Sequence, residues 1–131
     1  MKGIHVAAFT AVLACLAVLA LPAVAAGPGM TVKIPARQDV DRVYVLAAVH
    51  QKHCSLQVSG TVLGHRFKGF RKSSVTIHLT NQAFLRLSSS AKRSVKKALH
   101  KGRTVKARVT VTARNPSGSR NSVTRSVTLK D

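Results

Sequence analysis

The chain has 131 residues, enough for one domain, and its 22 lysine and arginine residues against three acidic residues give a net charge of +19 with the histidines neutral. General acid–base catalysis by paired carboxylates needs two such groups held opposite each other. The acids are Asp39, Asp41 and Asp131, two of them close together and one at the last position. The sequence therefore offers no such pair, and we expect a protein that is not an enzyme.

The first 26 residues have the features of a secretory signal peptide. Lys2 is followed by an apolar run from Ile4 to Leu21, and a proline then breaks the run just before the small residues of AVAAG. We predict cleavage after Ala25 or Ala26, a location outside the cytoplasm, and no stable membrane span afterwards. An uncleaved membrane anchor is the alternative, because the apolar run is just long enough to cross a bilayer.

After the signal we expect a flexible N-terminal segment at residues 27–41 and one domain at residues 42–131. Along the domain, apolar and polar residues alternate with a period of two, which is typical of β-strands with one buried face. In CSLQVSGTV, Cys54 and every second residue after it would face the core. The opposite face would carry the polar residues, namely Ser55, Gln57, Ser59 and Thr61.

We predict about seven strands. They lie at residues 42–49, 54–63, 65–70, 74–80, 83–88, 104–114 and 122–130. Glycines interrupt the third, HRFKGF, and make it the least regular. In the fourth, SVTIHLT, we expect Val75, Ile77 and Leu79 to point inward. The turn NPSGSRN, which has a proline and a glycine at its centre, joins the last two strands.

One helix is predicted between strands, at about residues 89–101. SSSAKRSVKKALHKG offers a serine as N-cap among Ser88 to Ser90, and Gly102 stands where a helix would stop. The apolar residues have helical spacing and define one buried face, namely Ala91, Val95, Ala98 and Leu99. A helix this short is marginal alone, so it must dock on the strands.

Histidine and cysteine are the remaining candidates for chemistry. His50, His53 and Cys54 are types of residue that bind zinc, and His65 or His78 would have to supply a fourth ligand. Three such residues on a loop that leads into a strand more often mean a solvated loop and a buried thiol. We therefore expect no metal site, no cofactor and a buried Cys54. A Cys–His nucleophilic pair would need an orienting residue, which the sequence does not identify.

The segment FLRLSSSAKRSVKKALHKGRTVKARVTVTARNPSGSRNSVTRSVTLK, residues 84–130, resembles the closing half of immunoglobulin-like β-sandwich modules in secreted bacterial proteins. Those modules read as a strand ending in a leucine–serine pair, a basic helix, a basic turn and a hairpin of alternating valine and threonine. The resemblance implies an all-β fold: an immunoglobulin-like sandwich of about seven strands with one short basic helix. It implies almost nothing about function.

The excess charge favours a polyanion as partner, because it creates a positive field without acids to balance it. If the apolar faces of the helix and of the strand 104–114 are buried, their basic residues form one outward region. The predicted polyanion-binding residues are Lys92, Arg93, Lys96, Lys97, Lys101, Arg103, Lys106, Arg108 and Arg114. We expect binding of anionic surface polymers through their backbone charge.

Two other functions remain open. The chain could be a structural or protein-interaction module of an envelope assembly, in which the charge only keeps it soluble. It could also bind nucleic acid, but without sequence preference, because few aromatic residues are present to stack on bases. Phe67 and Phe70 lie in a basic hairpin and are expected in the core. The oligomeric state is left open by the sequence.

Overall fold

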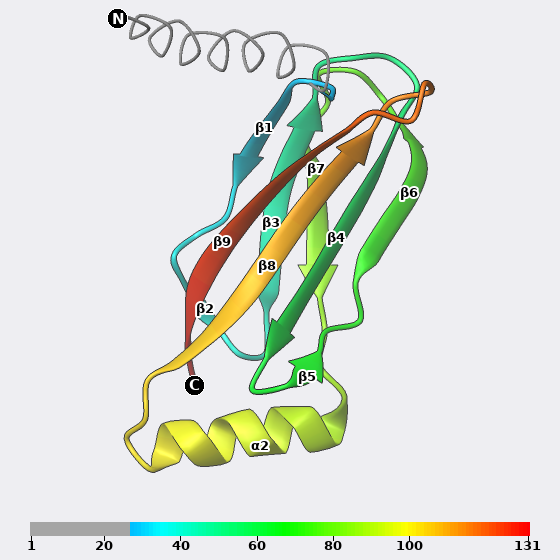
Figure 1. Ribbon diagram of the computed structural model, residues 1–131. Helices are drawn as coiled ribbons and strands as arrows, with labels where there is room; N and C mark the ends of the chain where they lie inside the picture. The colour runs from blue at the N-terminus through cyan, green and yellow to red at the C-terminus, as the bar shows by residue number, and fades with distance from the viewer. Residues whose placement is uncertain (1–26) are drawn as a thin grey trace, which may run out of the picture.

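The computed structural model describes residues 27–131, which fold into nine strands and one helix (Figure 1). In chain order the elements are β1 (Met30–Lys33), β2 (Arg37–Asp39), β3 (Val43–Val49), β4 (Cys54–Val62), β5 (His65–Arg66), β6 (Phe70–Val75), β7 (Asn81–Leu85), α2 (Ser89–His100), β8 (Val105–Arg114) and β9 (Arg120–Lys130). The predicted signal peptide, residues 1–26, lies outside the described residues. The predicted all-β character is confirmed.

The strands form two sheets. One has the order β1-β3-β7, and the other has the order β2-β9-β8-β4-β5, with β6 also paired to β4. The pairing of β2 with β9 is parallel, whereas the other pairs are antiparallel. Figure 1 shows the two sheets as two layers, with α2 lying across one end of them near the chain's C-terminus.

The core lies between the layers and consists mainly of valine. Val45 and Val49 of β3 belong to the same core cluster as Val109 and Val111 of β8, and all four side chains are fully buried. Buried and exposed residues alternate along β8, as the sequence predicted. Valine suits these positions because its branched side chain packs well on a pleated sheet. Cys54 is also fully buried, as predicted.

The helix begins and ends close to its predicted bounds. The hydroxyl of Ser88 accepts a hydrogen bond from the Ala91 amide at 3.2 Å, so Ser88 is the N-cap. Val95 is fully buried on the inner face. At the other end, Gly102 has a φ of +82° and its amide donates to the Leu99 carbonyl at 3.0 Å. Such a left-handed glycine satisfies carbonyls that the helix leaves unpaired.

The expectation of a flexible segment at residues 27–41 is wrong. β1 pairs with β3, and β2 pairs with the end of β9, so the segment contributes an edge strand to each sheet. The side-chain Nδ2 of Asn121 further donates a hydrogen bond to the Pro28 carbonyl at 3.0 Å. These strands have only four and three residues, which is too short for a period of two to appear in the sequence.

The predicted strand at residues 74–80 is also corrected. β6 ends at Val75, and Leu79 is 51% exposed instead of pointing inward. The chain turns here, because His78 adopts a left-handed φ of +64° and the Leu79 amide donates to the Thr76 carbonyl. The uncertain HRFKGF region forms β5 and the start of β6. With β1 and β2, this gives nine strands within residues 27–131 where about seven were expected.

Candidate functional site

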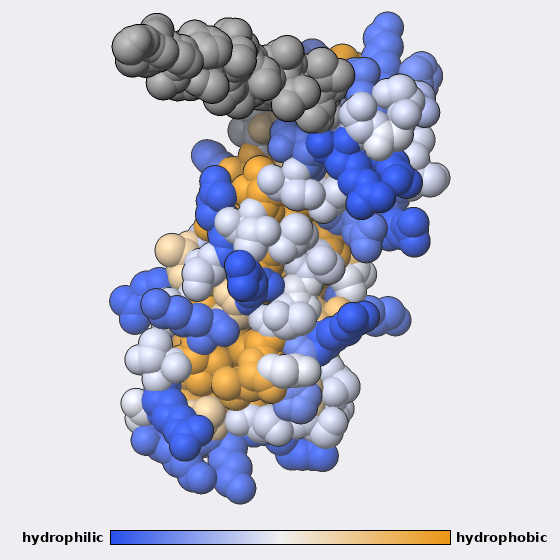
Figure 2. All heavy atoms as spheres, viewed as in Figure 1, coloured by the Kyte–Doolittle hydropathy of each residue, from blue (hydrophilic) through white to orange (hydrophobic). Residues whose placement is uncertain are grey.

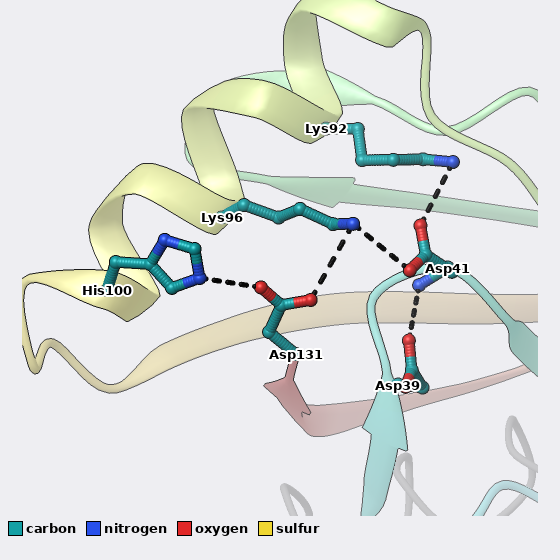
Figure 3. A network of polar contacts seen from close by, with 6 residues as sticks. All are labelled: Asp39, Asp41, Lys92, Lys96, His100 and Asp131. Carbon is teal, nitrogen blue, oxygen red and sulfur yellow. Dashed lines mark hydrogen bonds and ion pairs between the residues drawn. The ribbon is translucent and has the colours of Figure 1, made fainter.

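Two of the predicted polyanion-binding residues are occupied by acids of the chain itself. The ammonium of Lys92 lies 3.1 Å from Asp41, and that of Lys96 lies 3.2 Å from Asp41 and 3.6 Å from Asp131 (Figure 3). Hydrogen bonds from Lys92 and then Lys96 hold the pKa of the Asp41 carboxyl below its ordinary value. In turn, Asp41 raises the pKa of Lys96.

This cluster connects the helix to the strands. Asp41 follows β2, Asp131 follows β9, and His100 at the end of α2 places its Nε2 2.8 Å from Asp131. Asp39 completes the arrangement, since its carboxylate accepts a hydrogen bond from the Asp41 amide at 2.8 Å. Each ion pair is partly exposed and contributes little alone. Together they hold the helix against the ends of β2 and β9. They also neutralise part of the positive charge of Lys92 and Lys96, which is then less available to a ligand.

The other predicted residues are exposed and extend from the helix along β8. On the helix and its connection to β8 they are Arg93, Lys97, Lys101 and Arg103. On β8, Lys106, Arg108 and Arg114 point outward from the six-stranded sheet, as predicted. Because the strand rises about 3.4 Å per residue, Arg114 lies roughly 30 Å along β8 from the end at which it meets the helix connection. Arg114 is therefore far from the basic residues of the helix, whereas Arg103, Lys106 and Arg108 follow one another along the connection and the start of β8.

Register places additional arginines beside those of β8. Arg120 of β9 pairs with Arg114, while Arg66 of β5 shares its partner Thr61 with Arg108. Arg71 of β6 pairs with Gln57 of β4. These three arginines were not among the predicted binding residues. The alternation of β4 predicted that Gln57 points outward. The sequence does not show that β6 and β8 pair with β4, and this pairing is what places Arg71 and Arg114 near Gln57.

Between the arginines, the outer side of the sheet carries hydroxyl groups and one amide. We call this surface the hydroxyl face; its neutral members are Ser55, Gln57, Ser59, Thr61, Thr110, Thr112, Ser122, Thr124 and Ser126, and its charged members are Arg66, Arg71, Arg108, Arg114 and Arg120. Cross-strand hydrogen bonds join Thr110 to Thr124 at 3.0 Å and Thr112 to Ser122 at 2.9 Å. The face is thus ordered by side-chain contacts as well as by the backbone.

In the described part of the chain, three shallow hollows lie on the hydroxyl face: one of about 320 Å³ lies beside Lys106, Arg108, Thr124 and Ser126, and two others lie around Gln57 and Arg71. The larger of these two, of about 530 Å³, includes Arg66 and Arg108, and the smaller, of about 240 Å³, includes Arg114 and Arg120. Both are lined by Gln57 and Arg71, so they adjoin. Neither is lined by an acidic residue among residues 27–131. Figure 2, drawn in the view of Figure 1, shows white and orange areas between groups of blue side chains.

The chemistry available on this face is recognition of oxyanions. Arginine presents a planar fork of N–H donors that matches two oxygens of a phosphate, sulfate or carboxylate. Serine, threonine and glutamine add neutral donors and acceptors beside these forks. Histidine, cysteine and carboxylate side chains, which would serve as nucleophile or base, are absent from the described lining of both hollows.

The histidines and Cys54 named in the sequence analysis do not come together. Cys54 points into the core with its Sγ 3.8 Å from the Lys52 carbonyl, and burial raises the pKa of its thiol. His50 instead meets His78, with their Nδ1 atoms 2.9 Å apart, and its Nε2 lies 2.6 Å from the Thr31 hydroxyl. Within residues 27–131 no three histidine, cysteine or acidic side chains are grouped as metal ligands would be.

The aromatic residues contribute little to the hydroxyl face. Phe67 is buried and Phe70 is half-buried under the larger hollow. Tyr44 and Phe84 lie on the other sheet, where their ring centroids are 6.2 Å apart. Among the described residues, Phe70 is therefore the one partly exposed ring that lines a hollow of the hydroxyl face.

No protein-family model and no curated protein matches the chain. Among solved structures, it is similar to the solution structure of AT1g01470 from Arabidopsis thaliana, with a TM-score of 0.47 and 11% identity over 80% of this chain and 82% of that one. Within residues 27–131, no helix has the length and apolar character needed to cross a membrane.

Proposed function

We propose that the chain is a secreted, non-catalytic protein that binds anionic polymers of the cell surface through the hydroxyl face. One observation carries the proposal: five arginines on neighbouring strands lie around two adjoining hollows, and no acid lines these hollows in the described part of the chain. A polymer would be held through its repeated charges, without a deep pocket. The full sequence has a net charge of +19, which becomes +18 when Lys2 is removed with the signal, and this charge would speed the polymer's encounter with the protein.

The helix contributes less to this binding than the sequence predicted. Lys92 and Lys96 already hold Asp41, so a polymer would have to displace a carboxylate from each of them. The arginines of the hydroxyl face have no such competitor nearby. Charge that is not internally compensated attracts a polyanion more strongly. We therefore assign the main binding role to the sheet and an auxiliary, long-range role to the exposed helix residues Arg93, Lys97 and Lys101.

For the fold, we propose an immunoglobulin-like sandwich. Immunoglobulin domains place strands A, B and E in one sheet and strands C, F and G in the other, and some types add a strand beside C. The order β1-β3-β7 would correspond to A-B-E, and the order β9-β8-β4-β6 would correspond to G-F-C and the added strand. In this reading α2 replaces the short connection between strands E and F.

The test uses two variants that lose the same charge. Arg71→Gln, Arg114→Gln and Arg120→Gln remove three charges from the hydroxyl face, whereas Arg93→Gln, Lys97→Gln and Lys101→Gln remove three charges from the helix. Binding to fluorescent dextran sulfate is measured at one fixed salt concentration. We expect the sheet variant to bind at least tenfold more weakly than the parent, because each charge-assisted hydrogen bond contributes about 1.5–3 kcal/mol.

The helix variant serves as the matched control and is expected to lose only a few-fold. Equal losses in the two variants would mean that net charge alone governs binding and would contradict the assignment to the sheet. If the parent binds neither dextran sulfate nor polyphosphate, the proposal fails, and the structural-module alternative is favoured. Circular dichroism of both variants establishes that they are folded.

A further inference from the structure

Resting on the proposed function, we infer that the hydroxyl face recognises an acidic polysaccharide. Arg71, Arg114 and Arg120, which we call the three-arginine corner, would hold one sulfate or phosphate group of that polymer. The neutral rows beside the corner would bind the hydroxyl groups of the sugars. The ligand class is thus narrowed from any polyanion to a sugar polymer that carries spaced anionic groups.

The three-arginine corner has the composition of an oxyanion site. Arg114 and Arg120 are cross-strand partners, and Arg71 reaches the same hollow of about 240 Å³ from the other side of β4. Ser55 and Gln57 line this hollow as neutral polar groups. Three guanidinium groups around one small hollow repel each other unless an anion lies between them. An oxyanion that accepts their N–H groups would relieve this repulsion.

A second anionic position is set by the spacing of the charges. Arg108 and Arg66 lie at the other end of the face, with Thr61 between them in register. Arg114 is six positions beyond Arg108 on β8, which corresponds to about 20 Å along an extended strand. Across the rows in between, Gln57, Ser59 and the residues paired with them on β8 and β9 are neutral. With Arg71 of β6 beside Gln57, the face therefore carries charge at its two ends and at its β6 edge, with hydrogen-bonding groups on β4, β8 and β9 between them.

That distribution fits a polysaccharide better than a nucleic acid. A duplex carries one phosphate about every 3.4 Å along each strand, so about six would lie over a stretch of 20 Å, mostly above neutral side chains. Single-stranded nucleic acid is usually held by stacking on aromatic rings. The exposed residues of this face are not aromatic, and Phe70 in the larger hollow is only half-exposed. Sugar hydroxyls, in contrast, find donors and acceptors in every central row.

Two variants that keep the net charge test the inference. Arg71→Lys, Arg114→Lys and Arg120→Lys retain the charge but remove the planar forks, and Thr110→Val with Thr112→Val removes hydroxyls from the central rows. Each is titrated with dextran sulfate, with polyphosphate, which has charge but no sugar, and with oligothymidylate. We expect the lysine variant to bind dextran sulfate and polyphosphate on the order of tenfold more weakly. The valine variant is expected to weaken dextran sulfate binding several-fold and to leave polyphosphate unchanged.

Thr128→Val is the control for the valine variant, because Thr128 lies on β9 beyond the arginines and outside both hollows. A valine variant that binds dextran sulfate like the parent, or loses both ligands equally, would overturn the recognition of sugars. A lysine variant that binds like the parent would overturn the oxyanion site. Tighter binding of oligothymidylate than of dextran sulfate would assign the face to nucleic acid. Absence of binding to all three probes would instead defeat the proposed function itself.

Discussion

Asp41 holds the ammonium groups of Lys92 and Lys96 at 3.1 and 3.2 Å, and this small cluster changes the meaning of the basic helix. The sequence places these lysines on the polar face of the helix. The sequence pattern alone does not distinguish a ligand-binding face from a solvated one. It does not show that an aspartate distant along the chain lies against them. The sequence could therefore place Lys92 and Lys96 on the polar face of the helix, but it could not identify their partner. Cys54 shows the same limit, since its burial was predictable and the contact of its thiol with the Lys52 carbonyl was not.

The first prediction concerns the pH dependence of this cluster. The pKa of Asp41 is lowered from 3.8 by its lysine partners, so its contribution to folding is complete above that value and is lost as the pH falls through the lower folded pKa. Thermal unfolding of the parent and of Asp41→Asn should therefore differ most between about pH 5 and 7. The difference should vanish in strong acid. A difference that is constant down to the lowest pH would show that the carboxylate charge has no part in it.

At the scale of elements, the alternation of apolar and polar residues predicted the longer strands, and the serine cap predicted where the helix begins. β8 alternates buried and exposed residues from Val105 to Arg114, and α2 begins after the expected serine cap. β1 and β2 were missed because strands of three or four residues are determined by the sheet they join and not by their own pattern. The strand expected at 74–80 was wrong because the chain turns at His78, which has a left-handed backbone conformation. A histidine in the sequence does not reliably indicate that conformation.

The second prediction concerns the start of the helix. Ser88→Ala removes the hydroxyl that accepts the Ala91 amide hydrogen bond, so we expect it to lower the free energy of unfolding by about 1 kcal/mol. Urea denaturation followed by circular dichroism measures the change. Ser89→Ala is the control, because Ser89 is an exposed residue of the first turn. If both variants are equally stable, Ser88 does not act as the cap.

At the scale of the whole molecule, the site depends on which strands are neighbours. Alternation predicted Gln57 and Arg114 as outward residues of two separate strands, and sheet pairing places Arg71 and Arg120 beside them. Strand order within a sheet is not encoded in the period of any one strand, since it arises from packing and from the connections between strands. The hydroxyl face could therefore be predicted only in parts, and its arginine pattern required the fold.

The third prediction concerns export of the whole protein. We expect the chain to be recovered outside the cytoplasm with Ala26 or Gly27 as its first residue, because the segment before it has the charge and hydropathy of a cleaved signal. N-terminal sequencing of fractionated cells measures this. Recovery of a chain that starts at Met1 in the membrane fraction would identify the segment as an anchor.

The central claim, that polyanions bind to the hydroxyl face, is tested most directly by mapping backbone amide chemical shifts during titration with a short dextran sulfate. The account predicts that the largest shifts occur in β4, β6, β8 and β9, with Gln57, Arg71, Arg114 and Arg120 among them. It predicts smaller shifts for the exposed helix residues Arg93, Lys97 and Lys101. Shifts confined to α2, or distributed evenly over all lysine and arginine residues, would contradict it.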